Sequence, residues 1–202
     1  PDGLVFIYNN DWDVDDDNEG MFLINVIDTK GNKTTLSVTE DIKDNVKADS
    51  MDANLWDTNK YVGKFWAIDD VDEKGVVSSF VEDGSVNGEG ETVVSMGDGV
   101  VATTGTSMDY DNVTQFYFVD IKVDDNLSSE VATDDKMSLS DFGDFDPENF
   151  FNADDVDDEG TEKVPGTALV KDAEKSCHSV KAVMISQDDI TADYVYVVRV
   201  VW

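Results

Sequence analysis

The chain ends in the stretch Ala192-Asp193-Tyr194-Val195-Tyr196-Val197-Val198-Arg199-Val200-Val201-Trp202. β-Branched and aromatic residues fill it almost without interruption, and no turn residue follows them. This composition is typical of a strand inside a sheet and not of a free terminus. We therefore predict a buried strand here that other parts of the chain cover.

The first twelve residues carry a similar pattern. With a shift of 190 positions, the matching pairs are Val5 with Val195, Phe6 with Tyr196, Ile7 with Val197 and Trp12 with Trp202. Two interpretations are open: short buried strands resemble one another because few residue types suit a buried pleat, or the chain is one period of an array or one subunit of a polymer. The second interpretation predicts an assembly interface that contains Val5, Ile7, Trp12, Val195, Val197 and Trp202.

Strand patterns separated by turn residues recur along the rest of the chain. We expect strands at residues 4–8, 21–28, 33–38, 61–68, 76–81, 92–96, 100–103, 113–123, 164–170 and 179–186 and in the final stretch. Helical character is limited to residues 39–48, with Thr39 as a cap, and to one turn at 148–151. The prediction is an all-β fold, a sandwich or meander of about ten strands with long acidic loops and at most two short helices.

Two features of this strand pattern make sharper predictions. In residues 113–123, the face expected to meet the core carries Val113, Gln115, Tyr117, Val119, Ile121 and Val123. Between residues 69 and 76, Gly75 is expected to supply the positive φ that closes a hairpin. As to domains, we expect a single β-rich unit over residues 1–202, or two sub-lobes with a boundary in the glycine-rich stretch 83–99.

The charge of the chain is strongly negative. Its 46 acidic and 14 basic side chains give a net charge of -32. Nucleic acid and an anionic membrane surface are therefore disfavoured as partners, and no apolar run reaches the length of a membrane helix. Self-repulsion at this charge needs screening by multivalent cations or salt, so we expect a calcium-bearing or saline extracellular setting. A merely soluble acidic surface is the alternative.

Most of the acids are aspartates, 35 against 11 glutamates. Aspartate favours turns because its short side chain binds nearby backbone amides, whereas glutamate favours helices. The acids are therefore expected in the connections between strands.

Catalytic side chains are scarce. The single cysteine and the single histidine are the neighbours Cys177 and His178. In a strand their side chains point to opposite faces, so they cannot form a dyad with each other. A Ser-His-Asp triad or a histidine-rich metal site would need His178 itself. We expect a protein that is not an enzyme.

Calcium is the ligand that the acidic loops favour, because it binds several carboxylate and carbonyl oxygens from flexible loops. Three loops qualify: Asp13, Asp15, Asp16 and Asp17; Asp69, Asp70 and Asp72; and Asp154, Asp155, Asp157, Asp158 and Glu159. None is an EF-hand, since the twelfth position counted from Asp155 is Gly166 and not glutamate. Solvated acidic loops without an ion are the alternative.

Trp12, Trp56, Trp66 and Trp202 could form a platform on which sugars stack, or they could be anchors of the core and of interfaces. We predict a core position for Trp66 and interface positions for Trp12 and Trp202.

Several stretches resemble the β-rich repeats of surface-layer-type proteins, the S-layer homology domain-containing proteins of Gram-positive anaerobes. They are Lys60-Tyr61-Val62-Gly63-Lys64-Phe65-Trp66-Ala67-Ile68 with the hairpin Asp72-Glu73-Lys74-Gly75 into Val76-Val77, Thr114-Gln115-Phe116-Tyr117-Phe118-Val119-Asp120, Val180-Lys181-Ala182-Val183-Met184-Ile185 and Ala192-Asp193-Tyr194-Val195-Tyr196-Val197. The likeness is one of general strand and turn composition over most of the chain and includes no diagnostic motif. The stretches that carry it do not include the family's helical wall-anchoring module. It implies a secreted, non-catalytic building block of a surface layer or filament.

The sequence favours two functions from different classes. The first is a structural subunit that assembles with copies of itself through strand addition and terminal contacts, helped by divalent cations. The second is a calcium-dependent adhesin or carbohydrate-binding module that would take a cell-wall or glycan ligand.

Overall fold

The computed structural model describes residues 3–46, 61–81, 88, 90–123, 137–150 and 177–201. The strand expected at 164–170 lies outside them. The chain divides into two compact units: Pro1–Gly84 with Val123–Leu139, and Ser85–Lys122 with Ser140–Trp202. One boundary, between residues 84 and 85, falls within the stretch 83–99.

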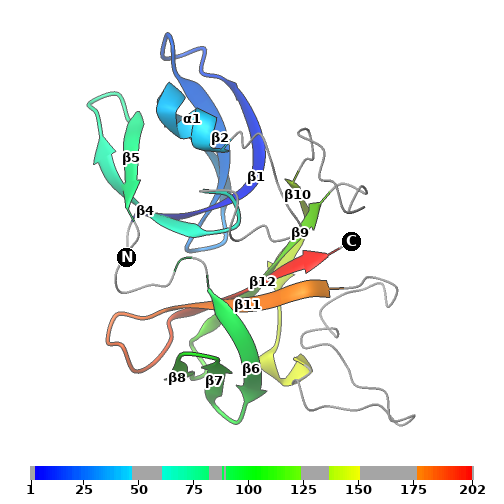
Figure 1. Cartoon of the computed structure of the whole chain (residues 1–202). Helices are drawn as coiled ribbons and strands as arrows, with labels where there is room; N and C mark the ends of the chain where they lie inside the picture. Colours follow the sequence, from blue (N-terminus) through cyan, green and yellow to red (C-terminus); the bar gives the residue numbers. More distant parts are fainter. Residues whose placement is uncertain are drawn as a thin grey trace. The chain divides into compact units, whose positions relative to one another are not determined.

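In the first unit, five strands close into a barrel in the order β1-β2-β3-β5-β4 (Figure 1). They are β1 (Leu4–Val14), β2 (Phe22–Asp28), β3 (Lys33–Val38), β4 (Phe65–Val71) and β5 (Val77–Val81). Neighbouring strands are antiparallel except for β3 and β5, which meet in parallel at Val38 and Val77. Helix α1 (Glu40–Val46) lies between β3 and β4 in the sequence. This order and helix position are the topology of the OB-fold, which by itself assigns no function.

Strand β1 is longer than predicted. Its pairing with β2 shifts register between Ile7 and Trp12, and the strand then continues to Val14. A bulge of this kind bends a strand and increases its local twist, so polar residues such as Asn9 and Asn10 are accommodated without ending the strand. The prediction that the strand ends at residue 8 is therefore wrong.

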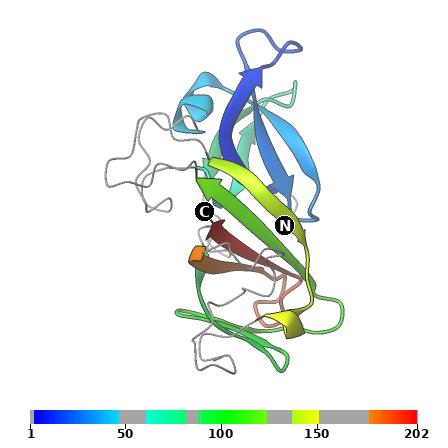
Figure 2. The ribbon, with the colours of Figure 1, turned by 90° about the vertical axis from the view of Figure 1, so that its right-hand side faces the viewer.

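Helix α1 packs against the barrel strands, as Figures 1 and 2 both show. Its buried residues Ile42 and Val46 are four positions apart, on the same face of the helix. The amide of Lys43 donates to the carbonyl of Thr39 at 3.1 Å, which closes the first turn. The predicted helix is thus confirmed over residues 40–46.

The second sheet has seven strands in the order β10-β9-β12-β11-β6-β7-β8. Their bounds are β6 (Glu91–Gly97), β7 (Val100–Thr103), β8 (Ser107–Asp109), β9 (Gln115–Val123), β10 (Met137–Asp144), β11 (Cys177–Ile185) and β12 (Tyr194–Val201). Strand β12 lies between β9, to which it is parallel, and β11, to which it is antiparallel. The predicted buried final strand is therefore confirmed.

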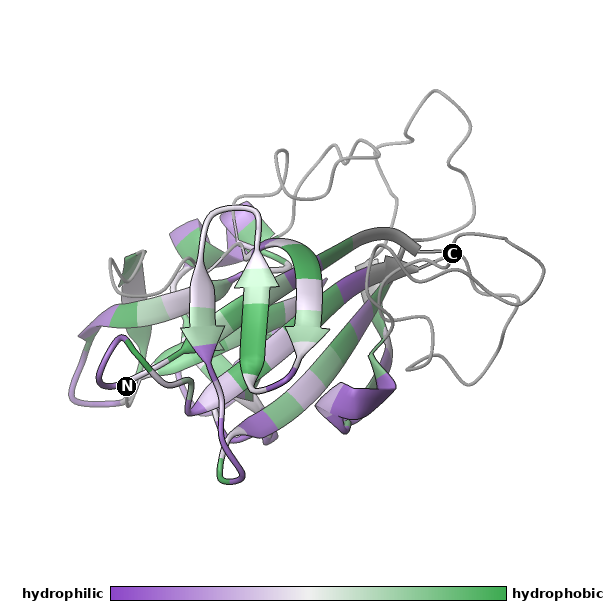
Figure 3. Ribbon diagram, turned by 90° about the horizontal axis from the view of Figure 1, so that it is seen from below, coloured by the Kyte–Doolittle hydropathy of each residue, from purple (hydrophilic) through white to green (hydrophobic). Residues whose placement is uncertain are grey.

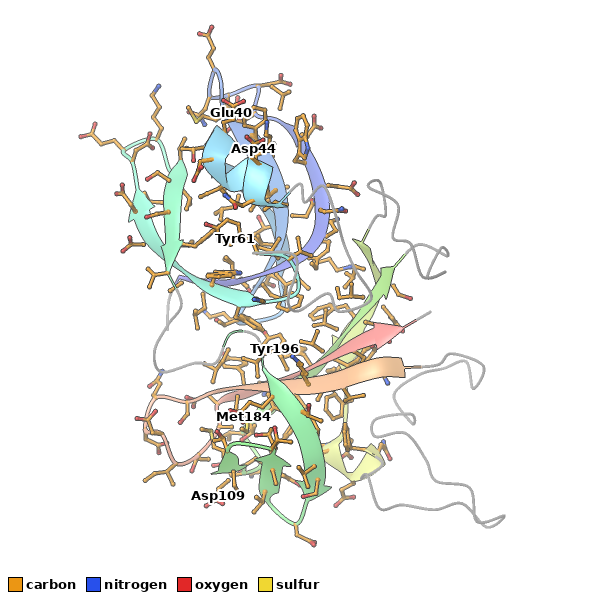
Figure 4. The ribbon with its side chains drawn as sticks, in the orientation of Figure 1. Glu40, Asp44, Tyr61, Asp109, Met184 and Tyr196 are labelled. Carbon is orange, nitrogen blue, oxygen red and sulfur yellow. The ribbon has the colours of Figure 1, made fainter. Side chains whose placement is uncertain are left out.

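Both faces of the middle of this sheet are buried. Phe116, Phe118, Val195 and Val197 belong to a core cluster on one face, and the opposite face carries Val119, Ile121, Tyr196 and Val198, also buried. Figure 4 shows Met184 and Tyr196 on opposite sides of the β11–β12 ribbon. The sequence had favoured only the face of Val119 and Ile121. That prediction was incomplete because β9 and β12 lie inside the sheet and carry buried apolar residues on both faces.

The all-β class is confirmed. Within the described residues there are twelve strands, helix α1 and the 3-10 turn η1 (Pro147–Asn149), close to the expected turn at 148–151. Hydrophilic residues concentrate in the turns and in η1, and apolar residues in the strands (Figure 3). Closure of the first five strands into a barrel is an arrangement that the predicted sandwich or meander did not include.

Candidate functional site

The first acidic loop, between β1 and β2, is organised by Asp15, which is buried. Its carboxylate accepts hydrogen bonds from the amide of Asp17 at 3.0 Å, Nδ2 of Asn18 at 2.9 Å and the hydroxyl of Ser37 at 2.5 Å. These bonds, above all the one from Ser37, lower the pKa of Asp15 because they stabilise its ionised form. The carboxylate thus ties the loop to β3.

The second acidic segment is the β4–β5 hairpin. Asp69 and Asp70 lie within β4 and not in a loop, and they accept hydrogen bonds from the hydroxyls of Ser79 and Ser78, both at 2.9 Å. Asp72 accepts two backbone amides, two and four residues further on, at 2.8 and 2.9 Å. Gly75 has the expected positive φ, 82°.

The predicted calcium ligands are therefore placed as follows. Asp13 lies in β1 and accepts the amide of Val14 at 2.8 Å, Asp15 turns inward, and Asp17 is exposed. In the described part of the chain, no three histidine, cysteine, aspartate or glutamate side chains gather as they would around a metal ion. Asp155, Asp157 and Glu159 lie outside the described residues. Calcium binding remains a prediction.

A common role of the aspartates emerges instead. In the described part of the chain, six of them accept the backbone amide of the residue two positions further on: Asp15, Asp28, Asp72, Asp111, Asp146 and Asp188. The expectation that aspartates occupy connections and bind nearby amides is confirmed at these positions.

The predicted assembly residues need a correction. Val5, Ile7, Val195 and Val197 are all buried within the chain. These four side chains therefore do not form a surface on which a second copy could dock. They resemble one another because both strands are buried, which was the simpler interpretation. Trp202 lies outside the described residues.

Two of the four tryptophans lie in the described part. Trp12 is 37% exposed, with its ring edge-on to Phe22 at 5.3 Å and the Lys43 ammonium 5.1 Å from its centre. Trp66 is half-buried, and its indole N–H donates to the carbonyl of Tyr61 at 2.9 Å. Trp56 and Trp202 lie outside the described residues. Both described rings are thus packed against neighbours within the first unit.

The most distinctive surface of the second unit consists of residues 109–115 and 186–193, which we call the paired loops. Asp109, labelled in Figure 4, begins the first of them at the end of β8. Four hydrogen bonds join them, from Asp109 N to Ile190 O (3.1 Å), Ala192 N to Asp109 O (2.8 Å), Gln115 N to Asp193 O (3.0 Å) and Thr114 Oγ1 to Ala192 O (2.6 Å). Two segments distant in the sequence thus form one fixed surface.

Each of the paired loops is also closed on itself by an aspartate. Asp111 accepts the amides of Val113 and Thr114, and Asp188 accepts those of Ile190 and Thr191. Bonds from the amides of Thr191 and Ile190 and from the Ser186 hydroxyl lower the pKa of Asp188. Both loops therefore have a backbone held by an aspartate carboxylate.

The residue presented by each loop is an exposed branched aliphatic side chain. Val113 is 70% exposed and Ile190 is 65% exposed. Both belong to the same four-residue pattern, Asp-x-(Val/Ile)-Thr, at Asp111-Asn112-Val113-Thr114 and Asp188-Asp189-Ile190-Thr191. Sequence reasoning missed this pair, although the repeated pattern was visible. It placed Val113 and Gln115 on the face that meets the core, which is wrong because β9 begins only at Gln115 and both side chains are exposed.

A hollow of about 620 Å³ lies beside the first of the paired loops. Residues of the β8–β9 loop, the start of β9, the end of β10 and η1 line it. Its walls include three aromatic rings, from Tyr110, Phe116 and Phe145, together with carboxylate and amide side chains.

Among the described residues there is no helix whose length and apolar character would let it cross a bilayer. The chain matches no protein-family model, no curated protein and no solved structure with which it was compared.

Proposed function

We propose that the protein is a non-catalytic structural subunit of an extracellular surface layer or filament that assembles with copies of itself. The observation that carries the proposal is the exposure of Val113 and Ile190 on the paired loops. Their backbone is fixed by hydrogen bonds, so docking orders little additional chain and loses little entropy. Val113 and Ile190 are the most exposed of the large apolar side chains in the described part of the chain, and exposed apolar side chains mark protein contacts where they lie together in one patch.

The size of this contact suits reversible assembly. Burying a valine or isoleucine side chain fully contributes about 1.5–3 kcal/mol, so the pair offers roughly 3–6 kcal/mol before the cost of association. Such a contact is too weak to hold an isolated dimer firmly, because association itself costs about 4–15 kcal/mol. In an array, where each copy meets several neighbours, weak contacts reinforce one another.

Charge sets the condition for assembly. Copies that each carry -32 charges repel one another, and the exposed carboxylates of Asp111, Asp188 and Asp189 flank the two apolar side chains. Calcium takes its oxygen ligands from flexible acidic groups. We place it between copies, where carboxylates of two chains would share it and their repulsion would be removed.

The route of assembly differs from the strand addition expected from the sequence. Strand β12 is already paired on both sides, with β9 and β11, so donating it to a neighbour would open its own sheet. Docking through the paired loops leaves the sheet intact. The resemblance to surface-layer proteins supports the same function.

The test is the double variant Val113→Ser with Ile190→Ser, compared with the wild type by sedimentation velocity in millimolar calcium. Both changes keep the backbone amides that Asp111 and Asp188 bind. We expect the wild type to form large assemblies and the double variant to sediment as a monomer with an unchanged circular dichroism spectrum.

The matched control is Val94→Ser on β6, a valine that is also exposed but lies outside the paired loops. It should assemble like the wild type. Assembly of the double variant to the wild-type extent would contradict the proposal, as would an equal loss in the control.

A further inference from the structure

The hollow beside the paired loops has walls that the fold holds in place. Phe116 is buried and belongs to the core cluster of the second unit. Tyr110 stands edge-on to it at 5.1 Å and Phe145 at 5.6 Å between ring centres. The amide of Phe145 also donates to the carbonyl of Phe116 at 3.1 Å. The three rings therefore form a continuous aromatic wall.

The charged side chains that line the hollow are all acidic. Carboxylates come from Asp111, Asp144, Asp146 and Glu148, and no residue of the described lining is basic. All four are exposed. The carboxylates of Asp111 and Asp146 accept backbone amides. An ionised carboxylate only accepts hydrogen bonds, so the lining favours a ligand that donates hydrogen bonds and carries positive charge.

We propose that the hollow binds an organic cation, an ammonium or guanidinium group attached to an apolar body. The rings would take the apolar body and attract the charge through their electron-rich faces, and the carboxylates of Asp144 and Glu148 would pair with the charged head. The volume lies in the range of small-ligand sites. A neutral sugar would leave the carboxylate charges uncompensated, and a bare metal ion would make no use of the rings.

The proposal stands apart from self-assembly, because a monomer could bind such a ligand equally well. Two sources share the chemistry: a free small amine, and a lysine or arginine side chain of another protein chain. The experiment separates them by the probes that it uses.

The measurement is a titration followed by the ¹H–¹⁵N signals of the side-chain amides of Asn112 and Gln115, which line the hollow. The probes are butylammonium, Nα-acetyl-lysine amide, methyl glucoside and calcium chloride. We expect saturable shifts with the two ammonium probes and an affinity that falls several-fold as sodium chloride is raised, because salt screens the charge pairing. Tighter binding of Nα-acetyl-lysine amide than of butylammonium indicates a side-chain source, and binding of butylammonium alone indicates a small amine.

The double variant Asp144→Asn with Glu148→Gln tests the site itself. Removing two partly solvated charge partners should weaken butylammonium binding by roughly fivefold or more. The control is Asp16→Asn with Glu19→Gln, which makes the same change in net charge at exposed positions of the β1–β2 loop. It should leave the affinity within about twofold of the wild type.

Several results would overturn the proposal. They are an equal loss in the control variant, no saturable shift with either ammonium probe, tighter binding of calcium than of ammonium at these signals, or salt-independent binding of methyl glucoside alone.

Discussion

At the scale of single residues, the aspartates are structural groups as well as surface charges. The carboxylate of Asp28 accepts the amides of Lys30 and Asn32 and the side-chain amide of Asn32, all at 2.9 Å. Partial burial alone would raise the pKa of Asp28, but the hydrogen bonds from Asn32 and Lys30 outweigh it and the pKa is lowered. The pKa values of Asp15 and Asp188 are lowered by similar bonds. Ionised carboxylates therefore hold these turns together.

This role predicts a specific pH dependence for Asp188→Asn. Since the folded pKa lies below the unfolded value of about 3.9, the stabilisation by the ionised carboxylate is fully present above pH 4 and is lost as pH falls through the folded pKa. We expect the variant to be less stable than the wild type at pH 7 and the difference to shrink below pH 4. Urea unfolding at stepped pH measures it.

Glu19→Gln is the control for the loss of one negative charge from the surface. A difference between Asp188→Asn and the wild type that stays constant from pH 7 down to roughly pH 2 would refute the structural role of this carboxylate.

The only arginine of the chain is used inside the second sheet. Arg199 and Asp120 are registered partners on β12 and β9, joined by two hydrogen bonds of 2.6 and 2.7 Å, and both are buried. The guanidinium also lies over the Phe118 ring, 5.4 Å from its centre. A pair with two parallel hydrogen bonds of this kind stabilises the sheet and also fixes the register of the two strands.

Breaking this pair should be costly because one charge would stay buried without its partner. We expect Arg199→Met to lower the free energy of unfolding by about 3–5 kcal/mol, and the double variant Arg199→Met with Asp120→Leu to recover most of that loss. Urea denaturation of the three proteins measures both values. A single variant that loses less than about 1 kcal/mol, or a double variant as unstable as the single, would show that the pair does not behave as a buried ion pair.

At the scale of elements, local sequence patterns predict individual strands, turns and the helix. They do not predict which strands far apart in the sequence pair with each other. The β4–β5 hairpin, helix α1 and the final strand follow from turn residues, helical spacing and apolar composition. Barrel closure depends on the single parallel meeting of Val38 with Val77, and the second sheet on the pairing of β9 with β12. No local pattern encodes which strands meet, because closing a long loop is decided by the energy of the whole fold.

In the candidate site too, the sequence shows the local pattern but not the contacts between distant segments. The four-residue pattern around Val113 and Ile190 is visible in the sequence, but their exposure depends on the hydrogen bonds that join the two loops. Of the predicted calcium ligands, Asp13, Asp69 and Asp70 lie in strands, which the acidic composition concealed. Composition indicated where carboxylates occur and could not show which of them the backbone already uses.

Helix α1 provides a test of the barrel as a unit. Ile42 is buried and α1 contacts β1, β2 and β5. Ile42→Ala should lower the free energy of unfolding by about 2–4 kcal/mol, because it removes apolar contacts and leaves a cavity. Asp44→Ala, which removes an exposed side chain of the same helix (Figure 4), should cost no more than about 1 kcal/mol. Equal losses in the two variants, measured by urea unfolding, would show that the helix does not contribute to the barrel core through Ile42.

At the scale of the whole molecule, the aspartates that hold the turns also make the chain strongly acidic. The net charge of -32 keeps copies apart, and the paired loops offer a fixed apolar contact once that repulsion is removed. The proposed cation-dependent assembly rests on these two properties together.

The most direct measurement is light scattering by the purified wild-type chain, first in millimolar calcium and then after addition of a chelator. If the proposed self-assembly holds, large assemblies form with calcium and dissolve when it is removed, and sodium at equal ionic strength has little effect. A chain that stays monomeric in calcium would contradict self-assembly and favour a binding module.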